Sequence, residues 1–178
     1  MAKIKRIEKA RKAHTCSKCR KEIKIGDPYL TATPYNRAPI IRCVECGLRS
    51  WETSGSEYVQ SMGELVEDWQ ENYGIDENTV DSIKDALEEI KDGCQDSLDN
   101  MPEQLQYSPT GEMLQERIDT IDGVISELDS IDLQQMIDDY NADNEDGDEC
   151  ELCDDVLPDD VKDDFIAAVD EALSGIEY

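Results

Sequence analysis

Apolar residues in the second part of the chain recur at intervals of three and four, the spacing of one face of an α-helix. A first helix is predicted between residues 53–56 and Gly74, and a second between residues 76–78 and Pro102. A third begins at Ser108-Pro109, where a capping hydroxyl precedes a proline in the first turn. The second and third helices carry an a/d seam of the coiled-coil type, which predicts an antiparallel hairpin or two helices of a compact bundle.

The flanking segments have other patterns. A last amphipathic helix is predicted at 159–174, after an acidic stretch, 138–156, that is too poor in apolar residues to fold alone and is predicted to be a linker. Before the helices, short β-like runs at 29–33 and 40–41 predict a small sheet.

Two Cys-x-x-Cys pairs surround the β-like runs: Cys16 with Cys19, and Cys43 with Cys46. Each two-residue gap lets a tight turn present two sulfurs to one ion, and four thiolates match tetrahedral Zn²⁺. We expect a structural zinc site with no open position. Disulfides are the alternative, which the odd total of seven cysteines disfavours. His14 is expected to neighbour this site rather than to be a ligand.

A third pair, Cys150 and Cys153, lies in the acidic linker. It can be half of a second zinc site, completed by Cys94, by Asp154 or by a second subunit, or it can be two free thiols. Redox chemistry is disfavoured, because surrounding carboxylates raise thiol pKa values. Cys94 occupies a seam position and is most simply a small core residue.

Charge is strongly segregated along the 178 residues, whose net charge is −27. Residues 1–49 hold 13 Lys and Arg against 4 Asp and Glu, whereas residues 50–178 hold 4 against 40. Such asymmetry predicts that the basic end meets an anion and that the acidic end meets a cation or imitates an anion. Two alternatives remain: the acidic part serves only solubility, or the two ends bind each other, within one chain or between chains.

The expected contact residues are the basic side chains of this end, helped by Tyr35 and Trp51 if these stack on bases. They are Lys3, Lys5, Arg6, Lys9, Arg11, Lys12, Lys18, Arg20, Lys21, Lys24, Arg37, Arg42 and Arg49.

Catalytic and membrane signals are absent from the sequence. It holds no phosphate-binding glycine loop, no His-Glu-x-x-His motif and no nucleophile elbow, and its single histidine precedes the first cysteine pair. No apolar run approaches the ~18 residues that span a bilayer. We therefore expect a soluble, cytoplasmic protein that is not an enzyme.

The segment after the second cysteine pair, 47–52, is expected to open a helix that holds Cys43 and Cys46 in its first turn. In a treble clef, a Cys-x-x-Cys turn, a β-hairpin and a helix follow one another in this order. The stretch 16–46, with Ile23-x-x-Gly26-Asp27-x-Tyr29, resembles treble-clef or zinc-ribbon modules related to PARP-type fingers. It also resembles small bacteriophage zinc-finger proteins that join such a module to an acidic helical region. PARP-type fingers have a histidine where this chain has Cys43. The resemblance covers about 13–52 and implies the fold and a phage origin.

The expected architecture is a small α+β treble-clef zinc module followed by an all-α antiparallel helical hairpin or bundle, an acidic linker and a C-terminal helix. The expected parts are a basic arm (1–13), the zinc module (14–52), the helices (53–137), the linker (138–156) and the last helix (157–178).

The expected function is that of a non-enzymatic, zinc-stabilised interaction protein. Its basic finger contacts nucleic acid or a protein, and its acidic helices bind a protein partner, with a homodimer as one arrangement. The alternative is a nucleic-acid mimic that inhibits a host nuclease, polymerase or defence effector in the host cytoplasm. Its helices approach the charge density of duplex DNA to within a factor of two.

Overall fold

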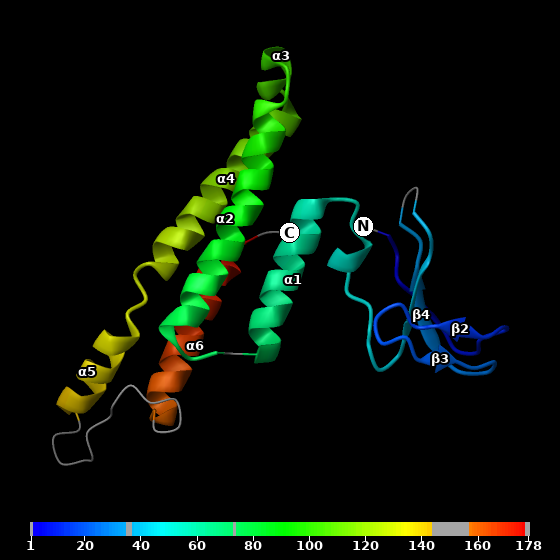
Figure 1. The fold of residues 1–178 in the computed structure, drawn as a ribbon, viewed down its shortest axis with the longest axis horizontal. Coiled ribbons are helices and arrows are strands. Elements are labelled where there is room, and N and C mark those ends of the chain that lie inside the picture. Colours follow the sequence, from blue (N-terminus) through cyan, green and yellow to red (C-terminus); the bar gives the residue numbers. More distant parts are fainter. Residues whose placement is uncertain (1, 35–36, 73, 144–156, 177–178) are drawn as a thin grey trace. The chain divides into compact units, whose positions relative to one another are not determined.

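The computed structural model describes residues 2–34, 37–72, 74–143 and 157–176 (Figure 1). It comprises a small antiparallel sheet region and a mostly helical part. The chain divides into two compact units, Met1–Gly63 and Glu64–Glu177. The division falls inside helix α1 (Glu57–Asn72) rather than at residue 53, where we expected the helical part to start. Each unit is described below by itself.

The first unit is built on two small antiparallel sheets. Strand β4 (Tyr29–Ala32) lies between β1 (Lys5–Ile7) and β5 (Ile40–Cys43). Strands β2 (His14–Thr15) and β3 (Glu22–Ile23) form the second sheet. The two β-like runs of the sequence are therefore confirmed as the β4–β5 pair, in which Tyr29 lies opposite Cys43.

Residues 1–13 are not a separate basic arm. Lys5 to Ile7 pair with β4, so that Lys5 lies opposite Thr31. Ala10 is buried, and its N–H donates to the Asp27 carbonyl at 2.9 Å. This segment is thus joined to the sheet and turns of the first unit. A three-residue strand is too short for its alternation to be read from sequence.

No helix opens on the second cysteine pair, so this expectation was wrong. Cys43 ends β5 and a turn follows. Gly47 then has φ +65°, which an α-helix does not accommodate. The next regular element is a 3₁₀ helix, η1 (Trp51–Thr53), whose Thr53 hydroxyl accepts from the Ala2 N–H at 3.1 Å. Trp51 lies against Gly63, where an added Cβ would overlap the indole ring.

The main helices of the second unit begin at the residues that the sequence predicts. Helix α2 (Glu77–Asp99) starts after Asp76, whose carboxylate accepts from the Thr79 N–H at 2.7 Å. Helix α4 (Pro109–Leu128) starts after Ser108, and α6 (Asp159–Ser174) matches the predicted last helix. We did not expect α3 (Glu103–Gln106) between α2 and α4, nor α5 (Leu133–Asp143).

Helices α2 and α4 lie side by side and run in opposite directions (Figure 1). Lys84 Nζ is 3.0 Å from Asp129 Oδ1, and Lys91 Nζ is 2.9 Å from Asp122 Oδ1, so one helix ascends as the other descends. Most seam residues of these helices are buried, whereas Ile90, Leu98 and Ile125 are half-buried. Helix α6 packs against α4 and α5. The fully buried side chains of the unit include Leu87, Ile121, Leu128, Leu133, Ile137, Phe165 and Val169.

Most of the predicted acidic linker, residues 144–156, lies outside the described residues, whereas 138–143 belong to α5. Within the described part of the chain, no helix is both long and apolar enough to cross a membrane.

Gly111 in the first turn of α4 approaches the backbone of α3 so closely that an added Cβ would overlap the Gln106 carbonyl oxygen. We predict that Gly111→Ala lowers the free energy of unfolding by about 1–3 kcal/mol. The matched control is Gly123→Ala on the exposed part of the same helix, where the Cβ meets open space. It should raise stability by up to ~1 kcal/mol. Urea titration followed by circular dichroism measures both, and equal effects would contradict the close approach.

Candidate metal centre

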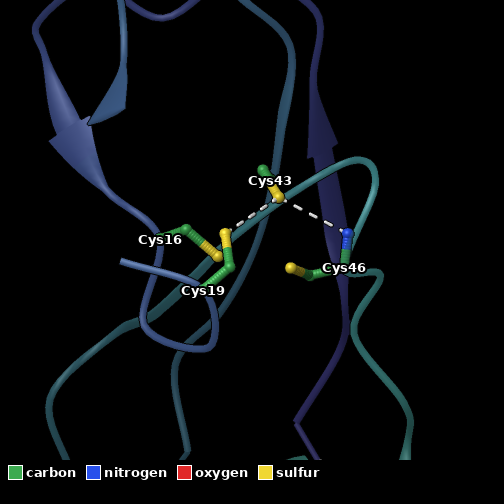
Figure 2. Close-up of side chains that lie close together, drawn as sticks. All are labelled: Cys16, Cys19, Cys43 and Cys46. Atoms are coloured by element: carbon green, nitrogen blue, oxygen red, sulfur yellow. Dashed lines mark hydrogen bonds between the residues drawn. The ribbon is translucent and has the colours of Figure 1, made fainter. Parts of the chain in front are cut away.

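The four cysteines of the first two pairs converge in the first unit. Their sulfur atoms all lie within 4.8 Å of one another, and Figure 2 shows the side chains pointing toward a common centre. Cys19 Sγ and Cys43 Sγ are 3.8 Å apart. In a regular tetrahedron with Zn–S bonds of ~2.3 Å, sulfurs are ~3.8 Å apart, so the cluster has the dimensions of a metal site.

Each pair lies in a tight turn that ends in the left-handed region. Arg20, directly after Cys19, has φ +62°, and Gly47, directly after Cys46, has φ +65°. The first turn is closed by the Arg20 N–H, which donates to the Cys16 carbonyl at 3.0 Å. In the second, the Cys46 N–H donates to Cys43 Sγ at 3.4 Å. Two similar turns therefore face each other across the sulfur cluster.

Contacts between the two turns hold them in register. Ser17 follows the first cysteine, and both its N–H and its hydroxyl donate to the Ile41 carbonyl at 2.9 Å. Lys21 Nζ lies 2.9 Å from Glu45 Oε2, a carboxylate inside the second pair. This hydrogen bond, with the Glu45 charge, raises the pKa of the Lys21 ammonium above its ordinary value. The sheet positions the turns, and these polar contacts close them.

The pKa values of two of the four thiols are shifted in opposite directions. Burial tends to raise the pKa of Cys16, but hydrogen bonds from the backbone of Cys19, Cys43 and Lys18 outweigh it and lower this pKa to about 6. Cys46 donates toward Cys43 and Cys19, and these hydrogen bonds raise its pKa to about 12. A metal ion that binds at neutral pH must displace the Cys46 proton, so binding weakens as the pH falls.

The cysteines also form much of the module's core. The buried cluster here consists of Ala10, Cys16, Ile23 and Cys43, and half of these residues are metal-ligand candidates. Tyr29, Ile41 and Cys46 pack against it. A core of this size supplies little hydrophobic stabilisation, so an ion at its centre would carry much of the folding free energy.

The other predicted metal residues stand apart from this cluster or lie outside the described residues. His14 is not part of the cluster; its ring lies 4.9 Å from the ring of Tyr29. Cys94 is buried in α2, and this burial raises its pKa, as fits a small core residue. Cys150 and Cys153 lie outside the described residues, so the second zinc site stays a prediction.

The predicted basic contact residues are exposed with one exception. Arg42 is the exception: its side chain is 15% exposed and forms an ion pair with Glu52, which is 14% exposed. We therefore remove Arg42 from the contact surface. Trp51 is half-buried beside Gly63, and Tyr35 lies outside the described residues. The exposed residues of the set are Lys3, Lys5, Arg6, Lys9, Arg11, Lys12, Lys18, Arg20, Lys21, Lys24, Arg37 and Arg49.

One structural role was missed from sequence. Glu52 accepts from the Arg49 N–H at 2.8 Å while it holds Arg42, and it thereby ties η1 to β5. No local sequence motif indicates that the Glu52 carboxylate pairs with Arg42, ten residues earlier in the chain. The left-handed turn at Gly47, by contrast, was visible as a glycine directly after a Cys-x-x-Cys pair.

Comparison of the chain with protein-family models, with curated proteins and with solved structures found no match.

We predict that the chain binds one zinc ion through these four thiols. Cys43→Ser should abolish stoichiometric zinc and unfold the sheet region around the cysteines, because the buried cluster that remains there is too small. Cys94→Ala, the matched control, should retain the metal, since Cys94 lies in the other unit. Zinc content by atomic absorption, and thiolate charge-transfer bands after Co²⁺ substitution, provide the measurement. Retention of one zinc by Cys43→Ser would contradict the assignment.

Gly47→Ala tests the left-handed turn. Nothing lies within 4 Å of the added Cβ, so the cost is purely conformational, about 1–2 kcal/mol in the stability of the zinc-loaded module. Gly55→Ala serves as control, because that glycine also has open space and has no left-handed φ. Chelator competition monitored by circular dichroism should show zinc lost earlier from Gly47→Ala alone.

Proposed function

We propose that the chain is a non-enzymatic interaction protein whose zinc-stabilised module contacts the phosphate backbone of nucleic acid, while its acidic helices engage a basic protein partner. The observation that carries the proposal is the coincidence of charge with structure. The unit Met1–Gly63 holds 13 basic against 6 acidic residues, and Glu64–Glu177 holds 4 against 38. Opposite charge thus resides on different compact units of the chain.

The proposed metal role is structural. Four thiolates fill a tetrahedral zinc shell, so no coordination position remains for substrate or water. The finer assignment of residues 14–52 to the treble clef rests on the resemblance. The two facing turns suit a zinc ribbon as well, since no helix holds the second cysteine pair. A phage origin, and with it the host cytoplasm as location, also rests on the resemblance alone.

Support for nucleic-acid contact comes from the exposed basic side chains on a small, folded body. Lys9, Arg11 and Lys12 flank Ala10, whose two backbone hydrogen bonds to the turn at Gly26 and Asp27 fix this segment. Fixed cations lose less conformational entropy when they meet phosphates than a free arm would lose. Contacts of this kind are independent of sequence and sensitive to salt.

We expect the zinc-loaded full chain to bind single-stranded nucleic acid in low salt, with affinity falling steeply as salt rises. Changing Lys9, Arg11 and Lys12 to Glu should lower the affinity at least ~10-fold. It should also reduce the log–log salt slope by ~2, about 0.7 per lost contact. Fluorescence anisotropy of a labelled oligonucleotide across a salt series measures both. Lys162→Glu in α6 is the control, and an equal loss there, or no binding at low salt, would contradict the proposal.

A second candidate function is that of a nucleic-acid mimic, favoured by the order of the acidic helices. Residues 76–132 hold 17 Asp and Glu against 3 Lys and Arg, and α2 alone spans 23 residues, or ~35 Å. The net charge per length is one per ~2.5 Å, compared with one per ~1.7 Å in duplex DNA. On this hypothesis the carboxylates occupy the phosphate-binding channel of a nuclease, polymerase or defence effector.

The mimic hypothesis predicts displacement of duplex DNA from a sequence-independent DNA-binding protein. Polyglutamate of equal total charge is the control, because it offers the same charge without helical order. A mimic should compete at far lower concentration than polyglutamate does in the same anisotropy assay. Equal competition would show that charge alone acts, and would remove this candidate.

A further inference from the structure

The connection between α2 and α4, together with the first turns of α4, exposes apolar side chains. Tyr107 is 85% exposed, Leu105 52% and Met113 39%, and together they account for three of the five large apolar residues exposed in the described part of the chain. We call these three residues the tip patch. The patch combines the residue types, tyrosine and methionine, that are enriched where proteins bind one another.

The tip patch stands on an ordered backbone. The Leu105 N–H donates to the Pro102 carbonyl at 2.7 Å, and Gln106 Nε2 donates to the Met101 carbonyl at 3.1 Å. Gly111 allows α4 to start against the α3 backbone. An ordered stretch of backbone therefore displays the apolar side chains. This surface would lose little conformational entropy when a partner binds to it.

Carboxylates surround the tip patch. Glu103 opens α3, and Glu112 and Glu116 lie in the same two turns of α4 as Met113; all three are exposed. No lysine or arginine occurs in the sequence between Lys91 and Arg117. A complementary surface must therefore present an apolar residue among cations.

The zinc module carries such a surface. Ile25 is 72% exposed, in a turn where the Lys24 N–H donates to Asp27 Oδ2 at 2.9 Å. This turn pairs with Ala10, since the Gly26 N–H donates to the Ala10 carbonyl and the Ala10 N–H to the Asp27 carbonyl, both at 2.9 Å. Ile25 is thereby placed beside a segment whose exposed flanking residues are Lys9 and Arg11.

We propose that the tip patch of one chain binds the Ile25 turn of a second copy of the same chain. The apolar side chains anchor the contact, and the opposite charges around them set orientation and partner choice. The two surfaces differ, so the contact is head-to-tail and can add further copies. Its small area places it in the weak, transient class. This inference goes beyond the proposed function, and its test contains no nucleic acid, so either can fail without the other.

The test uses the zinc-loaded full chain and two variants that each lose one surface. Leu105→Ser with Tyr107→Ser removes the tip patch, and Ile25→Ser removes the basic turn. All three positions are exposed, so folding should be unchanged, as circular dichroism can check. Sedimentation velocity at about 0.1 M salt, where the Debye length is ~10 Å, should show the wild-type mass rising with concentration into the high micromolar range.

Each variant alone should remain a monomer. An equimolar mixture should form a dimer and nothing larger, because each variant retains the surface that the other lacks. The mixture should return to monomers at about 1 M salt, where the Debye length is ~3 Å. Three results would overturn the proposal: a wild-type chain that stays monomeric, a single variant that still associates, or a mixture that does not form a dimer.

Discussion

Convergence of four sulfur atoms is the constraint on which the first unit depends. The strands around the cysteines have two to four residues, and the buried cluster at this place contains only Ala10 and Ile23 besides Cys16 and Cys43. Such short strands do not hold a sheet together by themselves. The cluster joins the turn after β2 to the end of β5, which are 24 residues apart at the pair Cys19 and Cys43. The sheet, the flanking turns and the exposed cations all take their positions from this junction.

The helical unit is stabilised by apolar packing between its helices and contains none of the four clustered cysteines. Its apolar residues are few, but many of them are buried on helices that contact one another, among them Leu87, Ile121 and Leu128. The four cations of this unit are too few to neutralise its carboxylates. Two of them, Lys84 and Lys91, bridge α2 and α4, and the carboxylates they meet raise the pKa of each ammonium. These partly exposed pairs contribute little energy each, but they lie between two acidic helices that would otherwise repel each other.

The sequence alone predicted those elements whose positions depend on hydrophobic periodicity, on helix-capping residues or on the spacing within a motif. The starts of α2 and α4 followed from Asp76 and Ser108, and the cysteine cluster followed from the spacing within each pair. What sequence missed depends on distant partners or on very short elements. Strand β1 has three residues and acquires its identity only by pairing with β4. Helix α3 has four residues, and the expected helix after Cys46 failed because a left-handed glycine intervenes.

The separation of charge has a consequence for any function of this chain. Because one chain joins a basic module to an excess of carboxylates, these carboxylates would compete with a phosphate backbone for the cations at a high effective concentration. Salt weakens both interactions together, because both are electrostatic. Apolar contacts respond differently to salt, and Ile25 and Tyr107 are exposed apolar residues that could provide such contacts. A ligand that covers an apolar side chain as well as the cations around it can displace the chain's own carboxylates, whereas a purely anionic ligand gains no such advantage.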